Sequence, residues 1–280
     1  MRNYFFPFLL MLMSGNAWAQ QNNLKNAISS TPVSILHPKV QKIKKPKPIS
    51  QEWTLGGGIN TDGWHVQFNK GKVKPVDEKL SDRFYNIKFW QVEISEHKHP
   101  KEIKGKSIGP TQTNDKAKPY IYGKINNFYD LKLGYGFRKM IAGKPEQGDI
   151  SVHWLYAGGL SIGLLKPYYI DAYVLRDNPR RIVRDNIKYS EEYSESFTDQ
   201  TKIVGSSGWT TGLGETKIIP GLYAKTAVQF DFAASNRSKL ALEIGVNAEL
   251  YAKKIALMVD QPAYPYFLNA YVALTFGRRK

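Results

Sequence analysis

The chain has 280 residues, a formal net charge of +16 at pH 7 and no cysteine. We therefore expect neither a disulfide framework nor a lipidated cysteine, so backbone pairing and burial must hold the fold together. The mean hydropathy of −0.43 is that of a soluble protein, but a membrane β-barrel escapes this measure because only every second residue faces lipid.

Residues 1–19 have the pattern of a secretory signal peptide. Arg2 supplies a positive charge, Tyr4–Met13 form a short apolar run, and Ala17-Trp18-Ala19 matches the small-x-small cleavage pattern. Export argues against nucleic acid as the partner of this basic chain. Lipid phosphates or an anionic envelope polymer are the more natural partners, and simple solubility of the loops is the alternative.

Residues 20–51 lack hydrophobic periodicity and contain four prolines. They carry no acidic side chain and six lysines, namely Lys25, Lys39, Lys42, Lys44, Lys45 and Lys47. This composition predicts a basic, disordered tether in the periplasm, which could reach an envelope protein.

From Glu52 onward the pattern changes to period two, which is typical of β-strands. The clearest segment is Lys239–Lys253, where even-numbered positions are apolar and most odd-numbered positions are polar or small. The phase slips between Phe89 and Trp90, which predicts a β-bulge there. The pattern predicts eight strands, at roughly 52–60, 64–74, 83–96, 128–141, 149–174, 218–233, 239–255 and 266–276.

The joins between these strands sort by length. Those on one side are short, at 75–82, 142–148 and 234–238. On the other side the joins at 97–127 and 175–217 are long, although the join at 61–63 is short. An even strand count with short turns on one side and long loops on the other favours an up-and-down antiparallel transmembrane β-barrel over residues 52–280.

Alternation alone does not say which face points inward, and a soluble barrel would turn its apolar face toward a ligand. The polar face carries charges of both signs: Glu52, Asp130, Asp231, Glu243 and Glu249 with Lys132, Arg138, Lys225 and Lys253. An unpaired charge is costly to bury, whereas a balanced set can pair inside a narrow barrel. We therefore predict an apolar face toward lipid and a charged interior filled by side chains.

Several short segments carry a family resemblance: Thr61–Val66, Tyr122–Tyr129, Tyr135-Gly136, Pro220–Lys225 and Leu268–Lys280. On these segments the chain resembles the eight-stranded OmpA and OmpX barrels and, more closely, uncharacterised outer-membrane barrels of the Bacteroidota. The resemblance covers most of the chain after Glu52. It implies an outer-membrane location but no activity. Barrels of this kind often end on an aromatic residue, and here Phe276 is followed by four further residues.

The predicted loop at 97–127 offers two candidate binding sites. Its lysines could bind lipopolysaccharide phosphates or another polyanion, with a solvated loop as the alternative. His97 and His99, two positions apart, could chelate a metal ion if a third ligand approached, although ordinary loop histidines are the simpler interpretation. The lysines are Lys98, Lys101, Lys104, Lys106, Lys116, Lys118 and Lys124.

Ser151 and His153 share one face of a predicted strand and are the only candidate catalytic pair that we single out. A nucleophile and its base must lie within hydrogen-bond reach, and this spacing permits that without requiring it. We expect a non-enzymatic outer-membrane barrel without a cofactor, acting in envelope structure or in binding a partner at the cell surface. The alternatives are a lipid A-modifying enzyme that uses Ser151 and His153, and a subunit of a secretion or transport assembly.

Overall fold

The computed structural model describes residues 49–75, 85–107, 118–143, 149–177, 180–233 and 237–280. The predicted signal peptide at 1–19 and all but the last three residues of the predicted tether lie outside these ranges. Those last residues belong to the folded part, because Ile49 packs on an interior apolar cluster and Gln51 begins the first strand.

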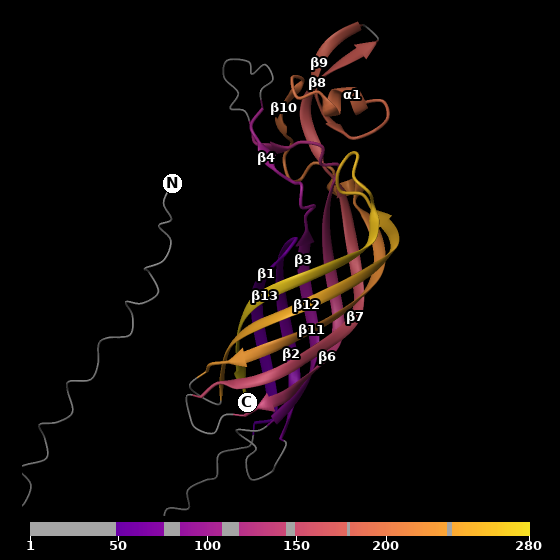
Figure 1. The fold of residues 1–280 in the computed structure, drawn as a ribbon. Helices are drawn as coiled ribbons and strands as arrows, with labels where there is room; N and C mark the ends of the chain where they lie inside the picture. The colour runs from indigo at the N-terminus through magenta and orange to yellow at the C-terminus, as the bar shows by residue number, and fades with distance from the viewer. Residues whose placement is uncertain (1–48, 76–84, 108–117, 144–148, 178–179, 234–236) are drawn as a thin grey trace, which may run out of the picture. The chain divides into compact units, whose positions relative to one another are not determined.

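Eight antiparallel strands form one closed barrel, as predicted (Figure 1). Each strand pairs with its neighbour along the chain, and the first strand pairs with the last to close the ring. The barrel strands are β1 (Gln51–Asn60), β2 (Gly63–Pro75), β3 (Tyr85–His97), β6 (Asn126–Ala142), β7 (Ser151–Pro167), β11 (Lys217–Asp231), β12 (Ser238–Ile255) and β13 (Tyr264–Arg279).

The two ends of the barrel differ. The start of β1 and the end of β13 meet at one end, which we call the terminal end, where the backbone N–H of Ser50 donates to the Lys280 carbonyl at 2.7 Å. The opposite end, which we call the loop end, carries the long connections at 98–125 and 168–216. The sorting of joins by length is therefore confirmed.

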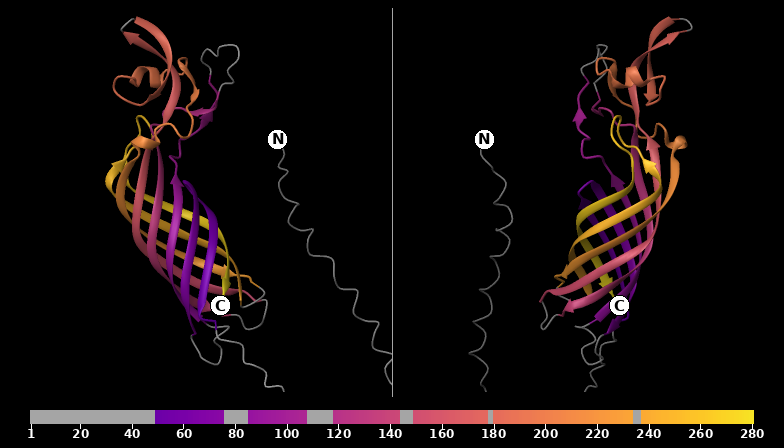
Figure 2. Two further views of the ribbon diagram at one scale, coloured as in Figure 1. Left: turned by 180° about the vertical axis from the view of Figure 1, so that it is seen from behind. Right: turned by 45° about the vertical axis from the view of Figure 1, so that its right-hand side comes forward.

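A second, three-stranded sheet lies beyond the loop end, which the sequence did not predict (Figure 2). It consists of β8 (Tyr169–Asp177), β9 (Arg180–Lys188) and β10 (Ile203–Ser206), and we call it the outer sheet. Around it lie three short elements and one 3₁₀ turn: β4 (Lys104–Gly105), β5 (Tyr120–Ile121), α1 (Ser194–Thr198) and η2 (Leu213–Glu215).

The expected single strand over 149–174 is wrong. The barrel strand β7 ends at Pro167, whose missing N–H cannot continue the ladder, and the chain then enters the outer sheet as β8. The outer sheet has its own apolar core, in which Ile170, Val174 and Phe197 are almost fully buried. The described residues include no helix with the length and apolarity needed to cross a bilayer.

The expected bulge in β3 is also wrong. The register between β2 and β3 runs without a break from Gly63 opposite His97 to Pro75 opposite Tyr85. Ile87 and Phe89 point into the barrel, where they form an apolar cluster with Leu155 toward the terminal end. Apolar residues on the interior face imitate a phase slip in the sequence pattern.

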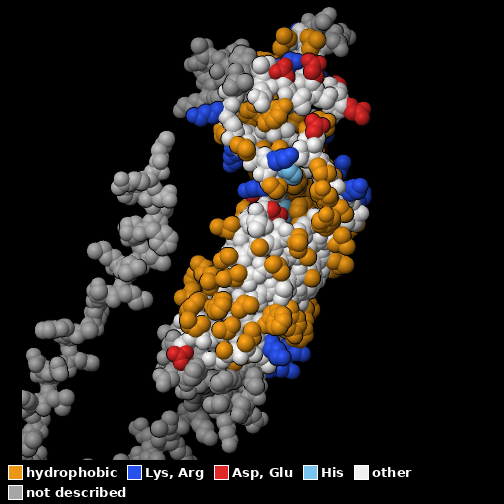
Figure 3. Space-filling model, viewed as in Figure 1, with side chains coloured by type: hydrophobic (Ala, Val, Ile, Leu, Met, Phe, Trp, Pro, Cys, Tyr) orange, Lys and Arg blue, Asp and Glu red, His pale blue; other side chains and the backbone are white. Residues whose placement is uncertain are grey.

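The outward surface of the barrel is apolar. Leu133, Leu160 and Leu222 lie side by side on three neighbouring strands and are 43%, 61% and 58% exposed. Figure 3 shows hydrophobic side chains over the visible barrel face and Lys and Arg side chains gathered toward its ends. An apolar outside with charges inside is the arrangement of a transmembrane barrel, not of a soluble one.

Candidate functional site

An ionic cluster fills the interior near the terminal end. Arg279 on β13 donates from Nε to Glu52 Oε2 at 2.7 Å and also contacts Asp231. Arg138 contacts Glu52, and Lys239 Nζ lies 3.2 Å from Asp231 Oδ2. All five side chains are nearly inaccessible to solvent, so each charge depends on its partners.

A second network occupies the interior toward the loop end. Lys132 Nζ lies 2.6 Å from Glu249 Oε1 and 3.1 Å from Glu93 Oε1, while Lys225 Nζ lies 2.9 Å from Glu93 Oε2. The charged interior is as predicted, with one correction. Lys253 is exposed, since β12 rises beyond the ring of paired strands at that level.

His97 belongs to this interior network. Its Nδ1 lies 2.6 Å from Asp62 Oδ2, and its Nε2 lies 3.3 Å from Asp130 and 3.2 Å from Glu249. An imidazolium at this position would donate a hydrogen bond from each ring nitrogen to these carboxylates.

The alternative metal site at His97 and His99 therefore has a different geometry from the expected one. The ligand atoms of His97, Asp130 and Glu249 are close enough to surround one metal ion, but Lys132 already pairs with that glutamate. His99 does not belong to this group of ligand atoms. Its Nδ1 instead accepts the backbone N–H of Lys101 at 3.2 Å.

Ser151 and His153 both point into the barrel at the terminal end of β7 and are fully buried. Neither Ser151 Oγ nor either His153 ring nitrogen has a hydrogen-bond partner among the described residues, so no hydrogen bond joins the two side chains. The His153 ring instead lies 5.3 Å from that of Tyr85. The enzymatic alternative stays a prediction.

A pocket of about 440 Å³ lies between the loop end of the barrel and the outer sheet, and we call it the mouth pocket. Four lysines line it, namely Lys98, Lys104, Lys124 and Lys166. Lys98 Nζ pairs with Glu96 at 3.2 Å, and Lys124 Nζ pairs with Glu102 at 2.6 Å. Two of the four lysines are thus balanced by carboxylates.

Lys166 differs from the other three lysines. It is 4% exposed and has no hydrogen bond or ion pair with any residue that the structure describes. Its Nζ lies 5.8 Å from the centre of the Trp209 ring, a cation–π contact. Because no described carboxylate pairs with the Lys166 ammonium, an anion bound in this pocket would be stabilised by it.

The pocket also offers aromatic and neutral polar groups. Tyr168 lines it and accepts the backbone N–H of Ile121 at 3.1 Å. Burial raises the pKa of the Tyr168 phenol, so this hydroxyl keeps its proton and can donate to an anion. Trp209 also lines the pocket and is 65% exposed.

The structure brings together part of the predicted basic loop. Lys98, Lys104 and Lys124 line the mouth pocket, whereas Lys101, Lys106 and Lys118 do not, and Lys116 lies outside the described residues. The sequence analysis missed Lys166. The only local signal was a lysine between an apolar run and Pro167, which marks the last residues of a strand.

No family model and no curated protein sequence matches this chain. Among solved structures, Neisserial surface protein A (NspA) is similar over 83% of this chain and 97% of its own, with 8% identity and a TM-score of 0.35. Ail, the attachment invasion locus protein of Yersinia pestis, is similar over the same shares, with 9% identity and a TM-score of 0.30. The fold assignment rests on the strand order and pairing of this chain.

Proposed function

We propose that this protein is a non-enzymatic outer-membrane barrel that holds an anionic ligand of the cell surface in the mouth pocket. The observation that carries the proposal is Lys166, a largely buried lysine that lines the pocket without a described counter-charge. With the strand ends of residues 50 and 280 in the periplasm, the usual orientation of such barrels, the mouth pocket lies on the extracellular side.

The filled interior supports a binding role over a pore. Interior side chains from all eight strands are buried, and salt bridges link β1 with β13, β3 with β11 and β6 with β12. An eight-stranded barrel is only wide enough for side chains, which leaves no path for a solute. We infer that the barrel is a plugged scaffold that holds its loop end at the membrane surface.

The proposal is tested by isothermal titration calorimetry, which measures the affinity of the refolded protein in detergent for inorganic pyrophosphate. Replacing Lys166 by Met removes one charge-assisted contact and should weaken binding by about tenfold or more. Lys118→Met is the matched control, because Lys118 is an exposed loop lysine outside the pocket, and it should bind as the wild type does. Equal affinities for both variants would overturn the proposal.

Two expectations about partners stay proposals. The segment 20–51 is proposed to reach an envelope protein in the periplasm, and deletion of that segment should release any such protein in a pull-down. A role as a subunit of a secretion or transport assembly is the second of these proposals.

A further inference from the structure

The wall of the barrel is incomplete at the loop end. Pairing between β1 and β13 stops at Asn60 opposite Tyr271, and the backbone N–H of Thr61 donates to the Ala270 carbonyl at 2.9 Å. The β1–β2 turn follows at once, so residues 264–269 of β13 pair with β12 alone. The barrel is therefore open sideways above this turn.

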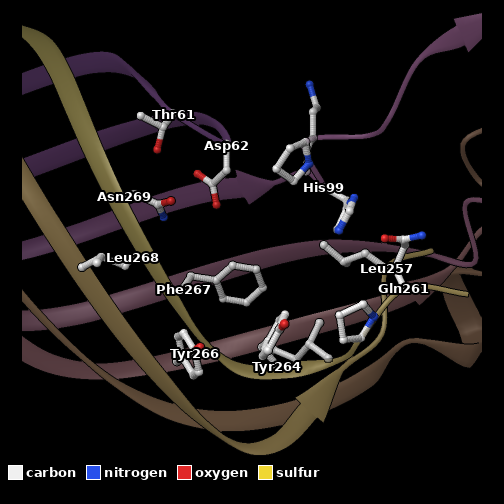
Figure 4. A pocket seen from close by; sticks show the side chains of 14 residues that line it. Thr61, Asp62, His99, Leu257, Gln261, Tyr264, Tyr266, Phe267, Leu268 and Asn269 are labelled. Atoms are coloured by element: carbon white, nitrogen blue, oxygen red, sulfur yellow. The ribbon is translucent and has the colours of Figure 1, made fainter.

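A groove of about 350 Å³ occupies this opening (Figure 4). We call it the lateral groove. On its membrane side lie Tyr264, Tyr266 and Leu268, which are 49%, 54% and 73% exposed. Ile255 and Leu257 line it from the end of β12 and the following loop.

Stacked aromatic rings form the floor of the groove. Phe267 lies in it and stacks on His97 with ring centres 4.6 Å apart, and on Phe128 with ring centres 5.4 Å apart. The register of β12 against β13 shifts between Leu250 and Ile255, so regular pairing ends beside the groove. A preformed apolar recess of this kind needs little rearrangement to accept a hydrocarbon.

The groove has one basic end, which lies beside the mouth pocket because one lysine lines both cavities. Lys98 lines both cavities, and its side chain is 47% exposed. His99 lies beside it at the rim. A molecule with an apolar tail in the groove would therefore place an anionic group at Lys98 and extend the rest of its head toward Lys166.

We propose that the lateral groove binds an acyl chain of a phosphate-bearing membrane lipid whose headgroup occupies the mouth pocket. The groove opens on the same apolar surface as Leu268, which faces lipid, so a chain can enter from the bilayer without crossing water. This inference rests on the proposed function, because the lipid phosphate is the anion of the mouth pocket.

Native mass spectrometry of the detergent-solubilised protein tests the inference with two lipids, dimyristoyl phosphatidic acid and dimyristoylglycerol, which share their chains. The wild type should bind the phosphatidic acid about tenfold more tightly than the uncharged lipid. Thr61→Trp and, separately, Gln261→Trp fill the groove and should each lower phosphatidic acid binding by about tenfold while pyrophosphate binding is kept. Ala224→Trp, on the lipid-facing side of β11, is the control and should change neither.

The outcomes separate the two proposals. If both groove variants bind phosphatidic acid as the wild type does, while Lys166→Met loses pyrophosphate, the lateral groove is not the chain site and the proposed function stands. If Lys166→Met retains both ligands, the proposed function falls and this inference falls with it. Heat-modifiable migration on a gel confirms that each variant is a folded barrel before it is tested.

Discussion

Arg279, the penultimate residue, points into the barrel and donates from Nε to Glu52 Oε2 on the first strand at 2.7 Å. This pair explains why β13 continues beyond Phe276, since Arg279 is needed to reach Glu52. Phe276 and Arg278 face outward, whereas Thr275 and Arg279 are buried, so the tail continues the alternation of β13. The seam that closes the barrel is thus ionic at its terminal end as well as hydrogen-bonded.

Arg279→Met should destabilise the barrel by about 3–5 kcal/mol, because it leaves Glu52 and Asp231 with one buried cation fewer. The measurement is the urea concentration at the midpoint of unfolding in detergent, with the folded fraction read from heat-modifiable gel migration. Arg278→Met, one residue away on the exposed face, should change the free energy of unfolding by no more than about 0.5 kcal/mol. Equal midpoints for the two variants would show that the interior pair does not hold the seam.

Leu160→Arg should destabilise the protein by about 2–4 kcal/mol in a bilayer, since Leu160 is an exposed residue in the middle of β7. Ile182→Arg is the control, because Ile182 is 72% exposed on β9 of the outer sheet. That substitution should cost no more than about 0.5 kcal/mol. A similar, small cost at both positions would mean that Leu160 does not face lipid.

Gly134→Ala should lower stability by about 1–3 kcal/mol through overpacking. A Cβ at Gly134 would overlap the Tyr223 hydroxyl oxygen and lie 2.7 Å from the Gly158 carbonyl, so the interior has no room for it. Gly57→Ala is the matched control, because its nearest neighbour would be the His65 carbonyl at 3.8 Å. Thermal unfolding of the two variants gives the comparison, and the idea fails if both midpoints fall equally.

The contact between η2 and the outer sheet should weaken in acid. Hydrogen bonds from Lys188 and Tyr169 hold the pKa of Glu215 below its ordinary value. A lowered carboxyl pKa contributes stability above the unfolded value and loses it as pH falls. The protection of residues 213–216 from hydrogen exchange, measured relative to the intrinsic exchange rate at each pH, should therefore fall as the pH drops below 4.5, the ordinary pKa of a glutamate.

Glu215→Gln should remove this pH dependence, because the amide does not titrate, and the exposed Glu191→Gln should keep it. A Glu215→Gln protein whose protection still falls below the same pH would contradict the assignment. Since Tyr169 lines the mouth pocket, acid should also alter pyrophosphate binding in the wild type.

Period-two alternation predicted the eight barrel strands, apart from the far end of 149–174, and placed Glu243, Glu249 and Lys132 on one face, because the face of a side chain follows from its position along a strand. The balance of charges on that face then assigned it to the interior. Net charge and the absence of cysteine follow from the composition and need no structure. The same reasoning failed at Phe89, where an apolar interior residue looked like a change of face, and at Lys253, which lies beyond the paired ring.

The mouth pocket, the lateral groove and the outer sheet were decided by the tertiary structure alone. Lys166 contacts Trp209, although 42 residues separate them in the sequence. The lateral groove exists because the β1–β2 hairpin ends earlier at the loop end than the neighbouring β12–β13 hairpin. Such features depend on the lengths and register of strands that are distant in sequence. Local alternation says which way a side chain points, but closure of the sheet determines what it meets.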